Sequence, residues 1–203
     1  MQLFDVKNMT QKQIKKFLNG SAIPRPVLTL STLNEDESIN IGPFSYFNIV
    51  SSHPPLLMVG IQRLNEQMKD TTRNILRTGE AVGHIADEET IEDVNQTAAS
   101  LVYGDSELKL TNFKTVNSLK VSVPGLDRFK IRYELKLNHH HVIKNHEGKL
   151  TTDLLLLEIV CFHIAESVYE NTYIMADQLK PVSRLAGADY AKLGEQYTIE
   201  RPE

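Results

Sequence analysis

The chain has 203 residues, of which 41% are hydrophobic, and this is enough for one domain with a substantial core. A formal net charge of −4 with dispersed basic residues argues against a nucleic-acid partner or an anionic membrane partner. The single cysteine, Cys161, excludes an intramolecular disulfide, and we expect a small buried hydrophobe there. No secretory signal precedes the first predicted element, and no apolar run approaches the ~20 residues of a membrane span, so we expect a cytoplasmic protein.

The first predicted elements are a short arm and a helix over residues 1–21. Thr10 is a plausible N-cap and Gly20 a stop, and apolar residues recur on one face, which we interpret as a packing surface. Arg25 follows between two prolines that stiffen the chain. Its guanidinium has two interpretations, a ligand anchor or a surface ion pair.

Four strand-like segments come next. Residues 27–33 and 38–43 predict a hairpin around a polar turn. Residues 44–52 mix large aromatic side chains with hydroxyls and an amide, and an apolar run over 56–61 follows a proline pair. Aromatic surface beside many small hydrogen-bonding groups suits a flat ligand with polar edges.

A helix is predicted from Lys69 to Gly79. Its first turn exposes free backbone N–H groups and the positive end of the helix dipole, and Lys69 and the Thr71 hydroxyl lie beside them. A phosphate would fit this position. The alternative is an ordinary surface helix that Asp70 caps while Lys69 is solvated, and we expect Asp70 to act as the cap in either case.

The second half of the chain predicts a strand over 80–86, a helix over 87–103, a long irregular loop over 105–130, and two long strands over 130–141 and 151–168. The apolar run 154–157 implies burial on both faces of its strand, which a subunit interface would provide.

Histidines and carboxylates in these segments give no recognisable catalytic or metal motif. His139, His140 and His141 alternate between strand faces and cannot all ligate one metal ion, so we predict no metal site there. Glu158 and His163 fall on opposite faces, and we expect hydrogen-bonded partners in the fold rather than acid–base catalysts. The chain lacks a nucleophile elbow, a zinc-protease motif and a Rossmann glycine pattern, so we predict no catalytic side chain.

Five short pieces nevertheless occur in one order: Arg25-Pro26, Ser31-Thr32, Pro43-Phe44-Ser45-x-Phe47-Asn48-x-x-Ser51-Ser52-x-Pro54-Pro55, Lys69-Asp70-Thr71-x-x-Asn74, and Arg184-Leu185-x-Gly187-x-x-Tyr190. Together they resemble the flavin reductase-like family of FMN-binding split barrels over roughly residues 20–195. The resemblance implies a mainly β protein, a six-stranded antiparallel Greek-key barrel with peripheral helices. It implies one domain over 1–203, with the arm and helix over 1–21 and a tail over 196–203 that we expect to be mobile.

The resemblance also implies a function. Members bind FMN, are usually homodimers, and reduce flavin with NADH or NADPH, in some cases for a monooxygenase or another redox partner protein. A flavoredoxin-like electron carrier that takes its electrons from a protein is the alternative, and a barrel that has lost flavin and serves as a binding module is a third possibility. Hydride passes directly from nicotinamide to flavin, so the chemistry needs positioning rather than a catalytic group.

Site residues follow from the same resemblance. Ser31 and Thr32 are expected on the ring or ribityl side. Ser45, Tyr46, Phe47 and Asn48 are expected along the isoalloxazine edge, and Ser51, Ser52, Lys69 and Thr71 at the phosphate end. Asn74, Arg184 and Tyr190 complete the predicted set. The family often has an asparagine near His84, so the histidine is a departure at the flavin edge.

Overall fold

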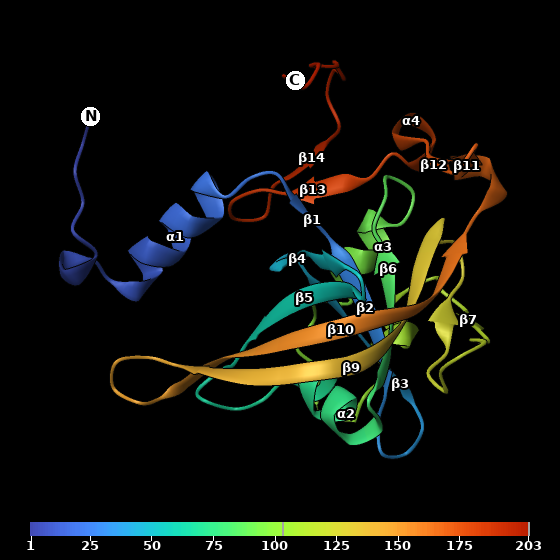
Figure 1. The fold of residues 1–203 in the computed structure, drawn as a ribbon. Coiled ribbons are helices and arrows are strands. Elements are labelled where there is room, and N and C mark those ends of the chain that lie inside the picture. The colour runs from blue at the N-terminus through green and yellow to red at the C-terminus, as the bar shows by residue number, and fades with distance from the viewer. Residues whose placement is uncertain (103, 203) are drawn as a thin grey trace.

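One antiparallel sheet of seven strands organises the molecule, in the order β3-β2-β6-β9-β10-β5-β4 (Figure 1). The computed structural model describes residues 1–102 and 104–202. The sheet strands are β2 (Leu28–Leu33), β3 (Ile39–Phe44), β4 (Phe47–Ser52), β5 (Pro55–Gln62), β6 (Glu80–Ile85), β9 (Ile131–Lys144) and β10 (Leu150–Ile164). The predicted mainly β, antiparallel class is confirmed, and the sheet has seven strands where the resemblance implies six.

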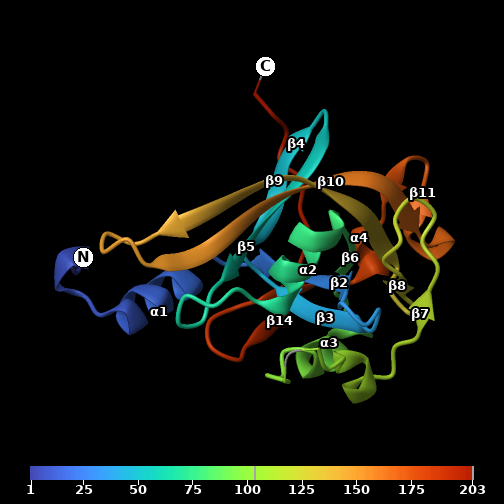
Figure 2. The ribbon, with the colours of Figure 1, turned by 90° about the horizontal axis from the view of Figure 1, so that it is seen from below.

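The sheet curls around a core to which most of its strands contribute alternate side chains. Leu28 and Leu30 of β2 pack with Leu155 and Leu157 of β10 although these strands are not hydrogen-bonded neighbours. Helix α2 (Asp70–Thr78) adds Ile75, which is fully buried in the same cluster. Figure 2 shows α2 lying across the barrel between β3 and the β9–β10 hairpin. The predicted helix from Lys69 to Gly79 is therefore confirmed, with Gly79 in the left-handed region at φ 73° as its C-cap.

The remaining elements surround this barrel. They are η1 (Val6–Asn8), α1 (Gln11–Ser21), β1 (Arg25–Pro26), α3 (Ile91–Gln96), η2 (Glu107–Leu110), β7 (Thr115–Val116), β8 (Gly125–Leu126), η3 (Glu166–Val168), β11 (Tyr169–Glu170), β12 (Tyr173–Ile174), α4 (Ala176–Leu179), β13 (Val182–Arg184) and β14 (Tyr190–Lys192). Strands β1, β13 and β14 form a second small sheet that joins the two ends of the chain. No helix among residues 1–102 and 104–202 is long and apolar enough to cross a membrane.

Helix α1 stands away from the barrel in both views (Figures 1 and 2). Its predicted start is confirmed, because the Thr10 hydroxyl accepts the amide of Gln13 and the Gln13 side chain accepts the amide of Thr10. The helix buries none of its residues: Phe17 is 46% exposed and Leu18 57%. On the predicted packing surface, the ring of Phe17 meets the ring of Phe4 from the arm edge to face at 5.0 Å.

Two further expectations are wrong. The helix predicted over 87–103 is confined to Ile91–Gln96, and residue 103 lies outside the described residues. The helix begins only at Ile91, because residues 87–90 form a turn in which the Thr90 hydroxyl and amide donate to Asp87 Oδ1. Cys161 is half-buried rather than buried, since β10 leaves the core towards its C-terminal end.

Candidate functional site

A cavity of about 350 Å³ lies where α1, the β3–β4 connection, β5, the start of α2 and the β13–β14 connection meet. Four of the predicted site residues line it: Ser45, Tyr46, Lys69 and Arg184. Phe44 and Tyr46 provide aromatic surface, and Gly60 and Gly187 provide backbone without a side chain. A cavity of this size with mixed aromatic and polar lining is in the range of small-ligand sites.

The charged residues around the cavity are all basic. Lys15, Arg25, Lys69 and Arg184 line it, and no aspartate or glutamate is among the described residues that do. Positive charge without a local carboxylate lowers the free energy of a bound anion. The cavity is therefore suited to an anionic ligand.

Arg25 holds two parts of this cavity together. Its Nη1 donates to the carbonyls of Asn19 at 2.8 Å and Ala22 at 2.6 Å, and its Nη2 donates to Leu185 O at 2.7 Å. Its Nε is buried without a hydrogen-bond partner among the described residues. These three acceptors are backbone carbonyls, so the Arg25 guanidinium does not form the surface ion pair that was one interpretation.

The start of α2 presents the donors that an anion needs. The amide of Arg73 is the first to bond back into the helix, to Lys69 O at 3.0 Å, which leaves the preceding amides of the helix without an intrahelical acceptor. Lys69 is the N-cap residue and makes no capping bond with its side chain. The expectation that Asp70 caps the helix is wrong, because Asp70 lies one residue inside it and its carboxylate pairs with Arg73 at 2.7 Å.

A buried polar network fastens α2 to the barrel. Asn40 Nδ2 donates to the hydroxyls of Thr32 and Thr71, both at 3.0 Å. Asn74 Nδ2 donates to Thr32 Oγ1 at 3.1 Å and Asn34 Oδ1 at 2.8 Å. Three predicted site residues, Thr32, Thr71 and Asn74, thus bond within the protein and fix the position of the helix start.

The other predicted residues lie elsewhere. The Ser31 hydroxyl is buried and donates to Pro124 O at 2.8 Å, and Phe47 belongs to the barrel core. Asn48, Ser51 and Ser52 belong to the β4–β5 hairpin, which projects from the barrel (Figure 2). Tyr190 stacks under the Arg184 guanidinium at 4.4 Å and reaches the cavity only through it.

His84 is a structural histidine. It is fully buried, its Nδ1–H donates to Thr29 O at 2.9 Å, and its Nε2 accepts the amide of Leu126 at 2.9 Å. A carbonyl can only accept and an amide can only donate, so the partners fix the neutral tautomer. Burial lowers the pKa of His84 from 6.5 to about 3.

The three consecutive histidines of β9 point to alternating faces of the strand, as predicted. His140 bonds through Nε2 to Asp153 Oδ1 at 2.8 Å, while His139 and His141 are exposed on the other face. Asp153 is fully buried and also receives Nε and Nη2 of Arg63 at 2.9 and 2.7 Å. This cluster lies across β5, β9 and β10 and stabilises the sheet.

Sequence reasoning missed the contribution of α1 to the cavity. Lys15 and Asn19 line it, and Asn19 Oδ1 accepts the Tyr46 hydroxyl at 2.6 Å. Lys15 and Asn19 are four positions apart and so share one helix face, next to the apolar face of the helix. The spacing of these polar residues was the available signal, but nothing local indicated that this face meets Tyr46 in the β3–β4 connection.

Comparisons with known proteins identify relatives of this chain. The sequence profile of a family described as flavin reductase like domain matches residues 20–182. An uncharacterized protein of Bacillus subtilis, YwrF, is 47% identical over the full length of both chains.

Solved structures are similar as well. The structure of nitrilotriacetate monooxygenase component B from Bacillus cereus is 42% identical, with a TM-score of 0.96 and coverage of 98% of each chain. The flavoredoxin of Desulfovibrio vulgaris (Miyazaki F) has a TM-score of 0.72 at 21% identity and covers 88% of this chain and 91% of its own, a likeness of fold.

Proposed function

Because this chain belongs to the flavin reductase-like family, we propose that it binds FMN in the cavity between α1, β5 and α2 and reduces it with NADH or NADPH. A flavin-related function follows from the family itself. The observation that carries the more specific proposal is the ring of four cations, without a carboxylate among the described lining residues, beside the free amides of α2.

The residues present fit this cofactor. The amides that open α2 and the Lys69 ammonium would hold the phosphate, since a helix N-terminus and a cation both stabilise an anion. Ser45, Phe44 and Tyr46 would border the ring system, because aromatic surface excludes water from a flat ligand while small polar groups bond its edge. The network of Thr32, Thr71 and Asn74 would act indirectly, by keeping the helix start in place.

The chain supplies positioning rather than acid–base chemistry. Bound FMN would supply the redox centre that accepts a hydride from the nicotinamide. Arg25 would hold α1 and the β13–β14 connection around the ligand through its carbonyl bonds. Tyr46 would keep Asn19 at the cavity wall through its hydroxyl. Arg184 would keep a positive charge over the cavity while stacked on Tyr190.

Two ligands that differ only in the phosphate test the binding mode. Lys69→Ala should weaken FMN about tenfold, equivalent to about 1.4 kcal/mol, and leave riboflavin binding unchanged. Lys149→Ala is the matched control, because this lysine is exposed in the β9–β10 loop and pairs with Glu147. Flavin fluorescence titration measures the affinities of wild type, Lys69→Ala and Lys149→Ala for both ligands. Equal loss of FMN and riboflavin, or no loss of either, would contradict the assignment of the phosphate to α2.

The electron donor is tested separately. When the FMN complex is mixed anaerobically with NADH or NADPH, the flavin absorbance should bleach. Bound flavin that neither nicotinamide bleaches, but that a reduced electron-transfer protein does, would favour the flavoredoxin-like carrier. A protein that binds no flavin at all would support the third interpretation, a binding module.

We also propose a cytoplasmic homodimer that passes reduced flavin or electrons to a monooxygenase or another redox protein. The apolar face of α1 is exposed in the single chain, and Leu154 and Leu156 on the outer face of β10 are only half-buried. Two such surfaces favour association. The similar Bacillus cereus protein is a component B of a monooxygenase, which supports a partner enzyme. Light scattering during gel filtration tests the dimer.

A further inference from the structure

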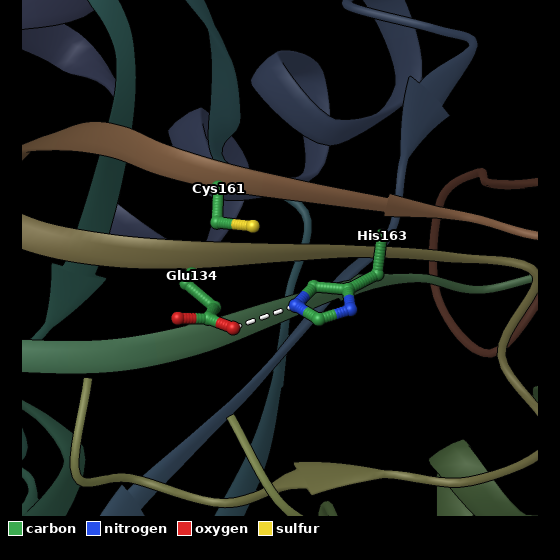
Figure 3. A group of neighbouring side chains, drawn as sticks. All are labelled: Glu134, Cys161 and His163. Atoms are coloured by element: carbon green, nitrogen blue, oxygen red, sulfur yellow. Dashed lines mark hydrogen bonds and ion pairs between the residues drawn. The ribbon is translucent and has the colours of Figure 1, made fainter. Parts of the chain in front are cut away.

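Three potential metal ligands lie together at the far end of the β9–β10 ladder: Glu134, Cys161 and His163 (Figure 3). Their ligand atoms are all within 4.8 Å of one another. Glu134 and Cys161 are cross-strand partners, and a β-bulge precedes the cysteine. His163 lies two residues after Cys161 and so shares its face of the strand, and its Nε2 is 2.6 Å from Glu134 Oε1.

Glu134 is held as an ionised, oriented carboxylate. Its side chain is fully buried, and its oxygens accept the amides of Leu119, Lys120 and Val121. A carboxylate fixed by backbone N–H groups is the arrangement that orients a metal ligand from its second coordination sphere.

We propose that Glu134, Cys161 and His163 form a site for Zn²⁺, with water as the fourth ligand. Carboxylate, thiolate and imidazole are all zinc ligands, and three protein ligands plus water complete a tetrahedron. In such a tetrahedron a nitrogen and an oxygen ligand are about 3.3 Å apart, so zinc binding lengthens the 2.6 Å separation of His163 Nε2 and Glu134 Oε1, and Cys161 Sγ lies within 4.8 Å of both atoms.

Access and proton balance agree with this site. The His163 side chain is 22% exposed and Cys161 is half-buried, so an ion can enter from solvent. Zinc binds Nε2 of His163 in the neutral tautomer whose proton is on Nδ1, so zinc takes the place of the hydrogen bond between His163 and Glu134. The Cys161 thiol gives its proton to water as it becomes the thiolate ligand.

The site is separate from the candidate flavin cavity. Gly60 lines the cavity and pairs with Leu154 on β10, which is seven residues from Cys161. At about 3.3 Å per residue the two lie roughly 23 Å apart along the strand. The zinc proposal therefore does not depend on flavin binding.

The single cysteine makes the test specific. Purified full-length protein without a polyhistidine tag, stripped with a chelator, is titrated with Zn²⁺ while Cys161 is reacted with a thiol reagent under non-denaturing conditions. We expect one zinc per chain and at least a tenfold slower thiol reaction once it is bound. Substitution of Co²⁺ should give a thiolate-to-cobalt charge-transfer band.

Variants separate ligation from folding. Cys161→Ser and His163→Gln should each weaken zinc binding at least tenfold, and Cys161→Ser should abolish the cobalt band. His146→Gln, at an exposed loop position, should change neither. Glu134→Gln is avoided because Glu134 also anchors the 119–121 loop. Absence of zinc binding to the wild-type protein, or binding that persists unchanged in both Cys161→Ser and His163→Gln, would overturn the proposal.

Discussion

The buried neutral His84 should make the protein lose stability as the pH falls below about 6.5. In the unfolded chain the imidazole binds a proton near pH 6.5, whereas burial holds the pKa of the folded protein at about 3. Between these two values the unfolded state binds more protons, so its free energy falls relative to the folded state. At pH 5 the difference is about 1.5 pH units, which is about 2 kcal/mol of lost stability from this residue.

The perturbation that isolates this effect is His84→Gln. A glutamine amide can donate to Thr29 O and its carbonyl can accept the amide of Leu126, but it cannot take up a proton. The chain has no tryptophan, so urea unfolding is followed by far-ultraviolet circular dichroism at pH 7 and pH 5. The variant should lose about 2 kcal/mol less than the wild-type protein between these pH values, whatever its stability at pH 7. His146→Gln, at an exposed position, is the control. An identical pH dependence in His84→Gln and wild type would refute the reasoning.

Three other substitutions test contacts that stabilise the sheet and the wall of the cavity. Asp153→Asn should cost about 3–5 kcal/mol in urea unfolding, because it leaves Arg63 buried without its charge partner. Glu147→Gln, in an exposed pair, is the control and should leave the unfolding free energy unchanged. Tyr46→Phe should weaken FMN about fivefold in a fluorescence titration by releasing Asn19, with unfolding free energy changed by about 1 kcal/mol; unchanged affinity would contradict a role for α1 in the site. Gly83→Ala should destabilise by about 1–3 kcal/mol, since a Cβ there would lie 3.1 Å from side-chain carbons of Leu28 and Leu135, while Gly20→Ala meets open space in helix α1 and should not destabilise.

The sequence correctly predicted the helix and the hairpin whose ends are set by nearby cap and turn residues. The helix from Lys69 to Gly79 has a left-handed glycine at its end, and the hairpin over 27–43 has a polar turn, so both were identifiable. Residues 90–93 have the residue types of a helix-capping motif, but the Thr90 hydroxyl bonds to Asp87 Oδ1 and the helix begins only at Ile91. A motif of the right residue types does not specify which acceptor the hydroxyl finds.

Some predicted site residues line the cavity and others bond inside the protein, again because of contacts that are distant in the sequence. Thr32 and Asn74 have the chemistry of ligand contacts, but the Asn74 amide donates to the Thr32 hydroxyl inside the protein. Only the pairing of β2 with β3 and the packing of α2 on them decide this. The same long-range register brings Glu134 beside Cys161, residues far apart in the sequence and without any recognisable ligand spacing. Composition and order could place a polar site in this region, whereas the direction of each side chain depends on strand pairing that the sequence pattern does not contain.

Helix α1 shows how a weakly held element can still shape a site. It buries no residue, so nothing comparable to core packing fixes it to the barrel. Hydrogen bonds hold it instead: the Tyr46 hydroxyl donates to Asn19, and the Arg25 guanidinium donates to the carbonyls of Asn19 and Ala22. Each such bond contributes at most about 1–3 kcal/mol to stability. Lys15 and Asn19 nevertheless form one wall of the cavity. A ligand that contacts this wall would add to these few bonds, so ligand binding and ordering of α1 must strengthen each other.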